Sequence, residues 1–467
     1  MNRRSFVKCI GAALAAPSIA IAAPRKRLPN IVFIFADDLG PQQITCYGNP
    51  YYKTPNIDTL ARDGMLFTDA YAACPVCSPT RANVMTGKYP ARLHLTDYIP
   101  GKVREYEKLL EPKWTKYLPL EEVTIPEMLK PAGYVSGHFG KWHLNKDKNY
   151  VLGRPMDPGS QGFDDVFTTV KPKKTDDPNK DAHHVKAITD HAIAFIEANK
   201  DKPFFCYVAH NSIHAPELER ADLVAAYKAR KGCDGKKNHS VLGAMVETLD
   251  KNTGRLLKKL DELGIADNTI VIFFSDNGCL QGKTVRKPFR GGKAQLYEGG
   301  IREPFLVRWP GVVKPGSRCS EPVSSIDFFP TFAEIAGQKV TDPDVDGVSI
   351  LPLLRQQGSF NRGDALYWHY PHYHSGGVAP SGAIRDGRYK LIEWYEESVL
   401  GLDNPVELFD VVADVGEYND LSKQKPELAA KMLKKLQAWR KSVGAQEMPV
   451  NPNYDPKKAK NSHRGEF

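Results

Sequence analysis

Four short apolar runs constrain the possible fold more than any other feature of the sequence. Each run is nearly continuous in hydrophobic side chains and ends at a polar or turn residue, a pattern typical of strands buried on both faces of a sheet. The runs are IVFIFA before Asp37, FFCYVA before His210, IVIFF before Ser275 and FLVRW before Pro310. Stretches with apolar residues three or four positions apart lie between them, at 56–64, 124–133, 182–199 and 242–263. This alternation predicts an α/β fold with a large mixed, mostly parallel sheet between two layers of helices.

The character of the sequence changes towards its C-terminal end. Between residues 365 and 410, short aromatic and β-branched runs are split by Gly and Asp, which favours a small antiparallel sheet. A stretch with helical apolar spacing follows at 426–443. We therefore predict a first domain at 24–358 and a smaller α+β domain at 359–467, made of an antiparallel sheet, a helix and a tail.

Residues 1–23 have the organisation of an export signal. A basic head with Arg3, Arg4 and Lys8 precedes an uncharged apolar stretch and the small-residue sequence Ala20-Ile21-Ala22, where a signal peptidase could cleave. The head resembles the twin-arginine pattern, which implies bacterial export of a folded protein to the periplasm or the medium. No other stretch reaches about 18 uncharged apolar residues, so we expect no stable membrane span.

The charge balance is mildly basic. The chain has 64 Lys and Arg against 55 Asp and Glu, a formal net charge of +9, which falls to +6 when the three basic residues of the signal are removed. Such an excess suits an anionic ligand. No basic block is dense enough for a nucleic-acid surface, so we expect no nucleic-acid partner.

The cysteine pattern does not indicate a zinc site. Cys74 and Cys77 form a C-x-x-C, but no second cysteine pair or histidine pair stands at matching spacing. Cys9 lies in the signal, which leaves seven of the eight cysteines, so at least one has a role other than internal pairing. Spacing does not decide whether the six besides Cys77 form pairs: Cys46, Cys74, Cys206, Cys233, Cys279 and Cys319.

Two of the predicted strands end in polar pairs. Asp37 and Asp38 follow the first run, and Asp276 and Asn277 follow the third. Ligands of parallel sheets gather at the carboxyl ends of strands, so three carboxylates and an amide are expected to converge at one edge. The alternative is that these residues only cap neighbouring helices.

The segment CSPTRANVMTG, which starts at Cys77, predicts a helix with a reactive group at its N-terminus. Pro79 fits the first turn of a helix, and Gly87 would end it. The helix dipole would favour a thiolate or a bound oxyanion at Cys77, with Arg81 one turn away. Cys77 is thus a candidate nucleophile facing an anion; the alternative is a buried structural cysteine beside a surface arginine.

This segment also resembles the signature of the type I sulfatases, whose cysteine is oxidised by a maturase to the aldehyde formylglycine. Other segments resemble the family's motifs in the same order along most of the chain. They are GKWHL at 140–144, HAP at 214–216, SDNG at 275–278, GKAQLYEGGIREP around Lys293 and ELFDVVADVGEYNDL from Glu407. The resemblance implies the alkaline-phosphatase-like superfold and a sulfuric ester hydrolase.

The resemblance also implies one Ca2+ ion. Its ligands would be Asp37, Asp38, Asp276, Asn277 and the modified residue at position 77. Carboxylate and amide oxygens are hard ligands, suited to calcium and poor for zinc or copper. Phosphatases of the same superfold carry Asp-His in the second segment and bind two zinc ions. Asn277 replaces that histidine here, which favours a single calcium and a sulfate ester.

The mechanism that the resemblance implies is covalent catalysis by the hydrated aldehyde, in which one hydroxyl attacks sulfur and the other expels sulfate. The catalytic residues implied are Cys77, Arg81, Lys141, His143, His214 and Lys293. Arg81 and Lys141 would hold the hydrate, and His143 would deprotonate it. His214 and Lys293 would bind sulfate oxygens, and His214 would protonate the departing oxygen.

Further histidines and an arginine are candidates for substrate binding. They are His94, His369, His372, His374 and Arg385, most of them in or beside an aromatic segment of the small domain. Rings and donors of this kind suit a sugar, although a small sheet also packs with aromatic clusters. The sequence thus predicts an exported sulfatase acting on a sulfated glycan of galactose or hexosamine type. The alternatives are an arylsulfatase, a phosphonate or phosphate monoester hydrolase, and a non-catalytic carbohydrate-binding relative.

Overall fold

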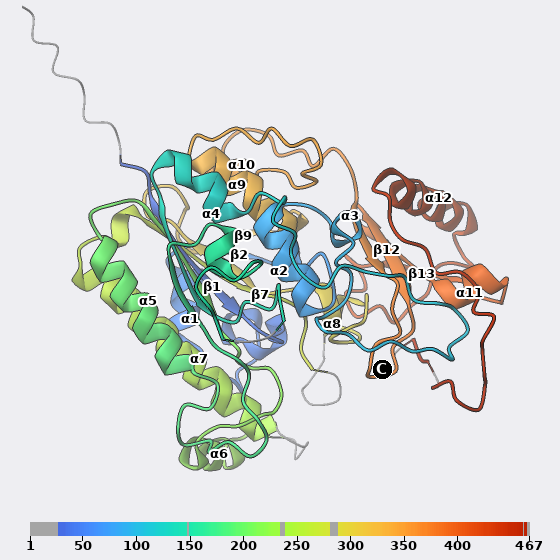
Figure 1. Ribbon diagram of the computed structural model, residues 1–467, viewed down its shortest axis with the longest axis horizontal. Coiled ribbons are helices and arrows are strands. Elements are labelled where there is room, and N and C mark those ends of the chain that lie inside the picture. Colours follow the sequence, from blue (N-terminus) through green and yellow to red (C-terminus); the bar gives the residue numbers. More distant parts are fainter. Residues whose placement is uncertain (1–26, 147–148, 234–238, 281–287, 461, 465–467) are drawn as a thin grey trace, which may run out of the picture.

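A large sheet and a smaller one form the framework of the protein (Figure 1). The structure is a computed structural model that describes residues 27–146, 149–233, 239–280, 288–460 and 462–464. In these residues the large sheet runs in the order β5 (Asp165–Thr168), β4 (Val135–Gly140), β6 (Phe204–Ala209), β1 (Asn30–Ala36), β7 (Thr269–Ser275), β8 (Phe305–Arg308), β2 (Met65–Phe67) and β9 (Ser317–Cys319).

The large sheet is mostly parallel, as the sequence predicted. β1 pairs in parallel with both β6 and β7, and β8 is antiparallel to its two neighbours. The register aligns Ala36 with Ser275 across β1 and β7. The carboxyl ends of these two strands therefore lie level at the same edge of the sheet.

Helices cover both faces of this sheet (Figure 1). Ile31, Phe33 and Phe35 of β1 point to one face, which is covered by α2 (Cys77–Thr86), α4 (Ile125–Leu129), α9 (Phe328–Ile335) and α10 (Leu351–Arg355). Val32 and Ile34 point to the other face, which is covered by α1 (Pro55–Arg62), α5 (Val185–Asn199) and α7 (His239–Glu262). All seven residues of β1 are buried because both faces are covered.

The smaller sheet is an antiparallel meander. It contains β11 (Leu366–Tyr370), β12 (Ser381–Asp386), β13 (Tyr389–Trp394) and β14 (Val406–Asp410) in that order. α12 (Pro426–Ser442) packs on it through Met432, Leu436 and Trp439. The predicted small sheet and its helix are therefore confirmed. The chain beyond them returns to the first domain, since the backbone N–H of Asn451 donates to the Lys108 carbonyl at 2.9 Å.

A buried set of charged residues joins the two sheets, and we call it the ion cluster. Its members are Asp69, Tyr71, Glu298, Arg302, Arg385, Lys390 and Glu417. Lys390 Nζ on β13 lies 2.8 Å from Glu298 Oε1 on α8 (Glu298–Ile301) and 2.8 Å from Glu417 Oε1. Arg302 Nε donates to Glu298 Oε2 at 2.6 Å. The side chains of Lys390, Glu298 and Glu417 are fully buried, so this network fixes the small sheet against the large domain.

The predicted signal at residues 1–23 lies outside the described residues. Within the described part, every helix is too short or too polar to cross a bilayer. The domain boundaries at 24–358 and 359–467 stay predictions.

Candidate active site

The ends of β1 and β7 bring the four predicted oxygen donors together. Asp37 and Asp38 follow β1 directly, Asp276 and Asn277 follow β7, and all four are fully buried. The Asp38 backbone N–H donates to Asp276 Oδ1 at 3.2 Å, and Asn277 Nδ2 donates to Asp38 Oδ1 at 2.8 Å. Asp38 has a left-handed backbone with φ of 63°. None of the described helices is capped by these residues, and the nearest, η1 (Pro41–Gln43), begins after Gly40.

Three cations surround these carboxylates. Lys141 Nζ lies 2.6 Å from Asp37 Oδ2, and Lys293 Nζ lies 2.6 Å from Asp38 Oδ1. Arg81 lies on α2, and its Nη2 and Nε donate to Asp276 Oδ2 at 2.7 and 3.1 Å. Each cation therefore binds one oxygen of a different carboxylate.

The side-chain oxygens that these cations do not contact are suited to bind a metal ion. Asp37 Oδ1, Asp38 Oδ2 and Asn277 Oδ1 are buried without a hydrogen-bond partner among the described residues. Ligand atoms of Asp37, Cys77 and Asp276 lie within 4.8 Å of one another. Burial and the negative charge of Asp37 raise the pKa of Asp276 above its ordinary value, so the carboxylates repel one another. Buried oxygens without donors are costly unless a cation binds them, and this donor set suits Ca2+.

Cys77 is the first residue of α2, as the sequence predicted. The helix ends at Gly87, whose φ is 71° and whose N–H donates to the Asn83 carbonyl at 2.8 Å. Cys77 Sγ lies 4.0 Å from Lys293 Nζ. However, burial raises the pKa of the Cys77 thiol despite the neighbouring lysines, because every residue of α2 is buried. The thiolate expected at a helix N-terminus is therefore not favoured here.

His143 presents a free lone pair in the site. Its Nε2 lies 2.6 Å from the Ile99 carbonyl oxygen, so Nε2 carries the proton and Nδ1 is the acceptor. Nδ1 is buried without a partner among the described residues. Burial and the charge of Lys141 lower the pKa of His143 well below its ordinary value. A neutral imidazole with an open Nδ1 is suited to accept a proton.

His214 is less suited to its expected role as an acid. Its Nδ1 lies 2.6 Å from the Ala215 carbonyl oxygen and must donate to it, and Nε2 lies 3.8 Å from Asp38 Oδ2. Burial and the charge of Lys293 lower the pKa of His214 to about 4. In the free protein Nε2 therefore carries no proton at neutral pH. Lys293 does: burial lowers the pKa of this amine, but Asp38 together with Cys77, Asp37 and Asp276 raises it by more.

Four of the residues expected to bind substrate are engaged elsewhere. His94 Nε2 lies 2.9 Å from the Gly444 carbonyl, and His369 bridges Tyr395 Oη at 2.6 Å and the Gln446 carbonyl at 2.8 Å. His372 Nε2 lies 2.8 Å from Thr96 Oγ1. Arg385 pairs with Asp69 at 2.8 Å in the ion cluster. Packing of the small sheet, which was the alternative, accounts for these contacts, and the structure does not bring the four side chains to the charged site.

The structure adds residues 98–101 to the site. The Ile99 backbone N–H donates to Ser78 Oγ at 3.1 Å, and the Ile99 carbonyl binds His143. Gly101 has a φ of 68°, and a Cβ there would lie 2.6 Å from Trp114 Cζ2. Sequence motifs do not reveal this segment, because its contacts to the site are made by backbone atoms.

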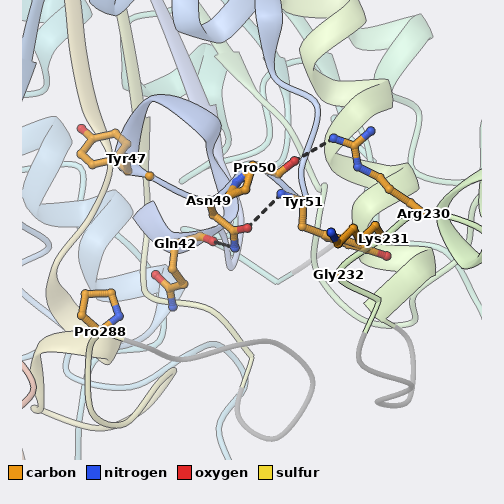
Figure 2. Close-up of a pocket in the computed structure, with 10 residues that line it drawn as sticks. Gln42, Tyr47, Asn49, Pro50, Tyr51, Arg230, Lys231, Gly232 and Pro288 are labelled. Atoms are coloured by element: carbon orange, nitrogen blue, oxygen red, sulfur yellow. Dashed lines mark hydrogen bonds between the residues drawn. The ribbon is translucent and has the colours of Figure 1, made fainter.

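A cavity of about 710 Å³ is lined by residues outside the charged site, and Figure 2 shows these residues. Its lining residues are Gln42, Tyr47, Gly48, Asn49, Pro50, Tyr51, Arg230, Lys231, Gly232 and Pro288. Gln42 links it to the end of β7, because Gln42 Nε2 donates to Cys279 Sγ at 2.8 Å. None of the charged residues described above lines this cavity.

Comparison with known proteins identifies the family of this chain. A family model described as Sulfatase matches residues 29–338, and one described as N-sulphoglucosamine sulphohydrolase, C-terminal, matches residues 292–442. The chain belongs to the sulfatase family. Similar relatives include a sulfatase of Formosa agariphila, 33% identical over 91% of this chain and 92% of the relative. An N-acetylgalactosamine-6-O-sulfatase of Bacteroides thetaiotaomicron is 29% identical over 88% of this chain and 93% of the relative.

Solved structures agree with this assignment. The sulfatase resembles Ps i-CgsB in complex with k-i-k-neocarrahexaose, with a TM-score of 0.74, 27% identity and coverage of 92% of this chain and 96% of that one. The phosphonate monoester hydrolase of Agrobacterium radiobacter, 18% identical with a TM-score of 0.65, shares the fold over 89% of this chain and 96% of its own. The predicted alkaline-phosphatase-like fold is confirmed, and the sulfatase is a sulfuric ester hydrolase.

Proposed function

We propose that this sulfatase hydrolyses a sulfate ester on a carbohydrate of galactose or hexosamine type. The observation that carries the proposal is the convergence of Arg81, Lys141 and Lys293 with the open carboxylate oxygens at the N-terminus of α2. Positive charge placed there stabilises the negative charge that develops on sulfate oxygens in the transition state. The names of a related N-acetylgalactosamine sulfatase and of a similar structure bound to a neocarrahexaose support the sugar class.

The proposal includes formylglycine at position 77. The raised pKa of the Cys77 thiol supports it, because a protonated thiol is a poor nucleophile. Formylglycine would supply a hydrated aldehyde whose hydroxyl can attack sulfur. A maturase would have to modify the segment before folding, since Cys77 is only 1% exposed in the folded chain.

The residues of the site would then have separate roles in metal binding and proton transfer. Asp37, Asp38, Asp276 and Asn277 would hold Ca2+, which supplies positive charge to sulfate oxygens. His143 Nδ1 is placed to accept a proton in the site. Lys293 carries a proton next to Cys77, and His214 Nε2, which lies 3.8 Å from Asp38 Oδ2, would contact a sulfate oxygen.

We also propose that the enzyme is exported to the bacterial periplasm or the medium. The basic and apolar pattern of residues 1–23 supports this. Sulfated polysaccharides are too large to cross a membrane unaided, so an enzyme that acts on them would meet its substrate outside the cytoplasm. Fractionation of the producing cell should find the mature enzyme without residues 1–23.

The enzyme should prefer an aryl sulfate to the matching aryl phosphate by about a hundredfold or more in kcat/KM. A phosphate monoester carries a second negative charge, which phosphatases balance with a second metal ion. Asn277 offers a neutral amide oxygen beside the carboxylates, which supports a site for a single cation. Rates on the two aryl esters and on defined galactose and hexosamine sulfates measure this. A preference for phosphate would contradict the sulfatase proposal, and turnover of no ester would favour a non-catalytic carbohydrate-binding protein.

Removal of calcium should lower kcat by about a hundredfold or more, because the carboxylates would again repel one another and the sulfate would lose its counter-charge. Dialysis against EGTA followed by Ca2+ or Zn2+ tests this, with recovery expected for Ca2+. Calcium should also raise the Tm of the treated protein. At a Ca2+ concentration 100 times the Kd, bound calcium adds ~2.7 kcal/mol to the free energy of unfolding. Asp37→Asn should weaken that shift. An EGTA-treated enzyme with full activity and no Tm response to Ca2+ would contradict the calcium site.

A further inference from the structure

Tyr98 is fixed next to the catalytic residues. Its neighbour Ile99 is held from both sides, by Ser78 Oγ at 3.1 Å and by His143 Nε2 at 2.6 Å. The Tyr98 ring packs against a buried apolar cluster that contains Val76 and Ala294. Since these residues adjoin Cys77 and Lys293 in the chain, the ring lies beside the two groups that would meet the ester.

His374 lies against Tyr98 on the connection between β11 and β12. The ring centroids are 5.6 Å apart, with an interplanar angle of 66°. Arg104 Nη2 donates to the His374 carbonyl, and Arg104 Nη1 in turn lies 3.4 Å from Glu107 Oε1. This histidine is therefore held by the first domain as well as by its own loop.

Hydrogen bonding sets the tautomer of His374. The Gly376 backbone N–H donates to His374 Nδ1 at 3.1 Å, so Nδ1 must be the acceptor. Burial and the charges of Lys293 and Arg104 lower the pKa of His374 to about 4, so the ring is neutral at pH 7. A neutral ring with an accepting Nδ1 has a single donor, the Nε2–H. No hydrogen bond of this donor is found among the residues that the structure describes.

Both side chains are half-buried, between the largely buried charged site and the exposed residues Ser375 and Gly376. Lys293 acts electrostatically on both of them, which places them on its side of the site. An aromatic ring with one oriented donor matches the surface of a pyranose, which has apolar C–H faces and hydroxyls at its rim.

We propose that Tyr98 and His374 are the specificity-determining residues for the sugar that carries the sulfate. The Tyr98 ring packs against a C–H face of the sugar, and His374 Nε2–H donates to a hydroxyl or ring oxygen. The inference rests on the proposed function, because it assumes a saccharide leaving group. An aryl sulfate can also pack against Tyr98 but offers no hydroxyl to His374.

The test compares two substrates in each variant. They are 4-nitrophenyl sulfate and whichever galactose or N-acetylhexosamine monosulfate the wild type hydrolyses fastest. His374→Ala should reduce kcat/KM for the sugar sulfate about 10- to 100-fold more than for the aryl sulfate, because a hydrogen bond to the sugar is lost. His374→Gln should restore part of the difference, since its amide can donate. His191→Ala is the matched control, because His191 stacks on Phe167 at 3.8 Å on α5 and should leave the ratio unchanged.

Tyr98 is tested by a second pair of variants. Tyr98→Phe should keep kcat/KM for the sugar sulfate within about threefold, whereas Tyr98→Ala should lose about tenfold or more, because the ring supplies the packing. A tenfold loss in Tyr98→Phe would overturn the packing role.

Different results would contradict the sugar-specificity role of Tyr98 and His374 and the proposed sulfatase function. Equal losses of His374→Ala on both substrates, or no loss on the sugar, would overturn the specificity proposal while hydrolysis itself stands. An enzyme that hydrolyses only the aryl sulfate would also overturn it. A wild type that hydrolyses no sulfate ester would overturn both the function and the inference.

Discussion

Cys77→Ala is expected to lower kcat/KM for a sulfate ester by about a thousandfold or more. The variant lacks the side chain from which the nucleophile would form, but it keeps Arg81, Lys141 and Lys293, which we propose bind the sulfate. Substrate affinity should therefore change much less than kcat. Single-turnover rates together with equilibrium binding of the same ester separate the two quantities.

Mass spectrometry of the wild-type peptide around Cys77 tests whether the nucleophile forms at this position. The active protein should carry a carbonyl group at position 77, which a hydrazide reagent captures, and activity should rise with the converted fraction. Cys77→Ala provides the matched unreactive peptide. Full turnover by Cys77→Ala, or by a preparation that keeps the thiol throughout, would contradict a nucleophile at this position.

Lys390→Met is expected to destabilise the protein by about 3–5 kcal/mol. Lys390 is fully buried and lies 2.8 Å from both Glu298 and Glu417, so its loss removes the cation between two buried carboxylates and leaves Arg302 as the ion-pair partner of Glu298. The ionised form of Glu298 depends first on Lys390, which helps to hold the pKa of this carboxyl below its ordinary value against burial. Thermal and urea unfolding measure the effect.

Lys435→Met provides the matched control. Lys435 also lies between two carboxylates, at 2.9 Å from Asp364 and 3.0 Å from Asp386, but its side chain is 36% exposed. Exposed pairs of this kind contribute about 0–1 kcal/mol, because water solvates the charges that remain. Equal destabilisation by the two substitutions would contradict the importance that we give to burial of the ion cluster.

The strands that the sequence revealed most clearly are those buried on both faces. β1, β6 and β7 are continuous apolar runs, and their ends placed Asp37, Asp38, Asp276 and Asn277 correctly at one edge. β4, with the sequence VSGHFG, gave no such signal. Gly140 is required there by tertiary packing, because a Cβ would lie 1.9 Å from the Ala209 carbonyl oxygen of β6.

Protonation states could not be predicted from the motifs. The dipole of α2 favours a thiolate at Cys77, but desolvation by the surrounding core has the larger effect and raises the pKa. His214 carries the expected motif, yet its bond to the Ala215 carbonyl and its burial leave Nε2 without a proton. The burial of both groups depends on neighbours that are distant in sequence, whereas the bond of His214 to Ala215 depends on the local backbone.

Residue type alone also could not separate binding from packing in the small domain. His369, His372 and His374 share one aromatic segment, but the first two are engaged by Tyr395 and Thr96. The turn at Gly376 fixes the tautomer of His374, and its Nε2–H has no hydrogen bond among the described residues. Tyr98 was not predicted because its segment contains no motif.

The ion cluster has an evolutionary consequence. It anchors the small sheet through Arg385 on β12 and Lys390 on β13, whereas His374 stands on the connection between β11 and β12. That connection can therefore vary in length and sequence while the anchor keeps the sheet in place. We therefore expect that exchanging this connection changes the sugar preference that we propose for His374, while the ion cluster keeps the small sheet attached to the first domain.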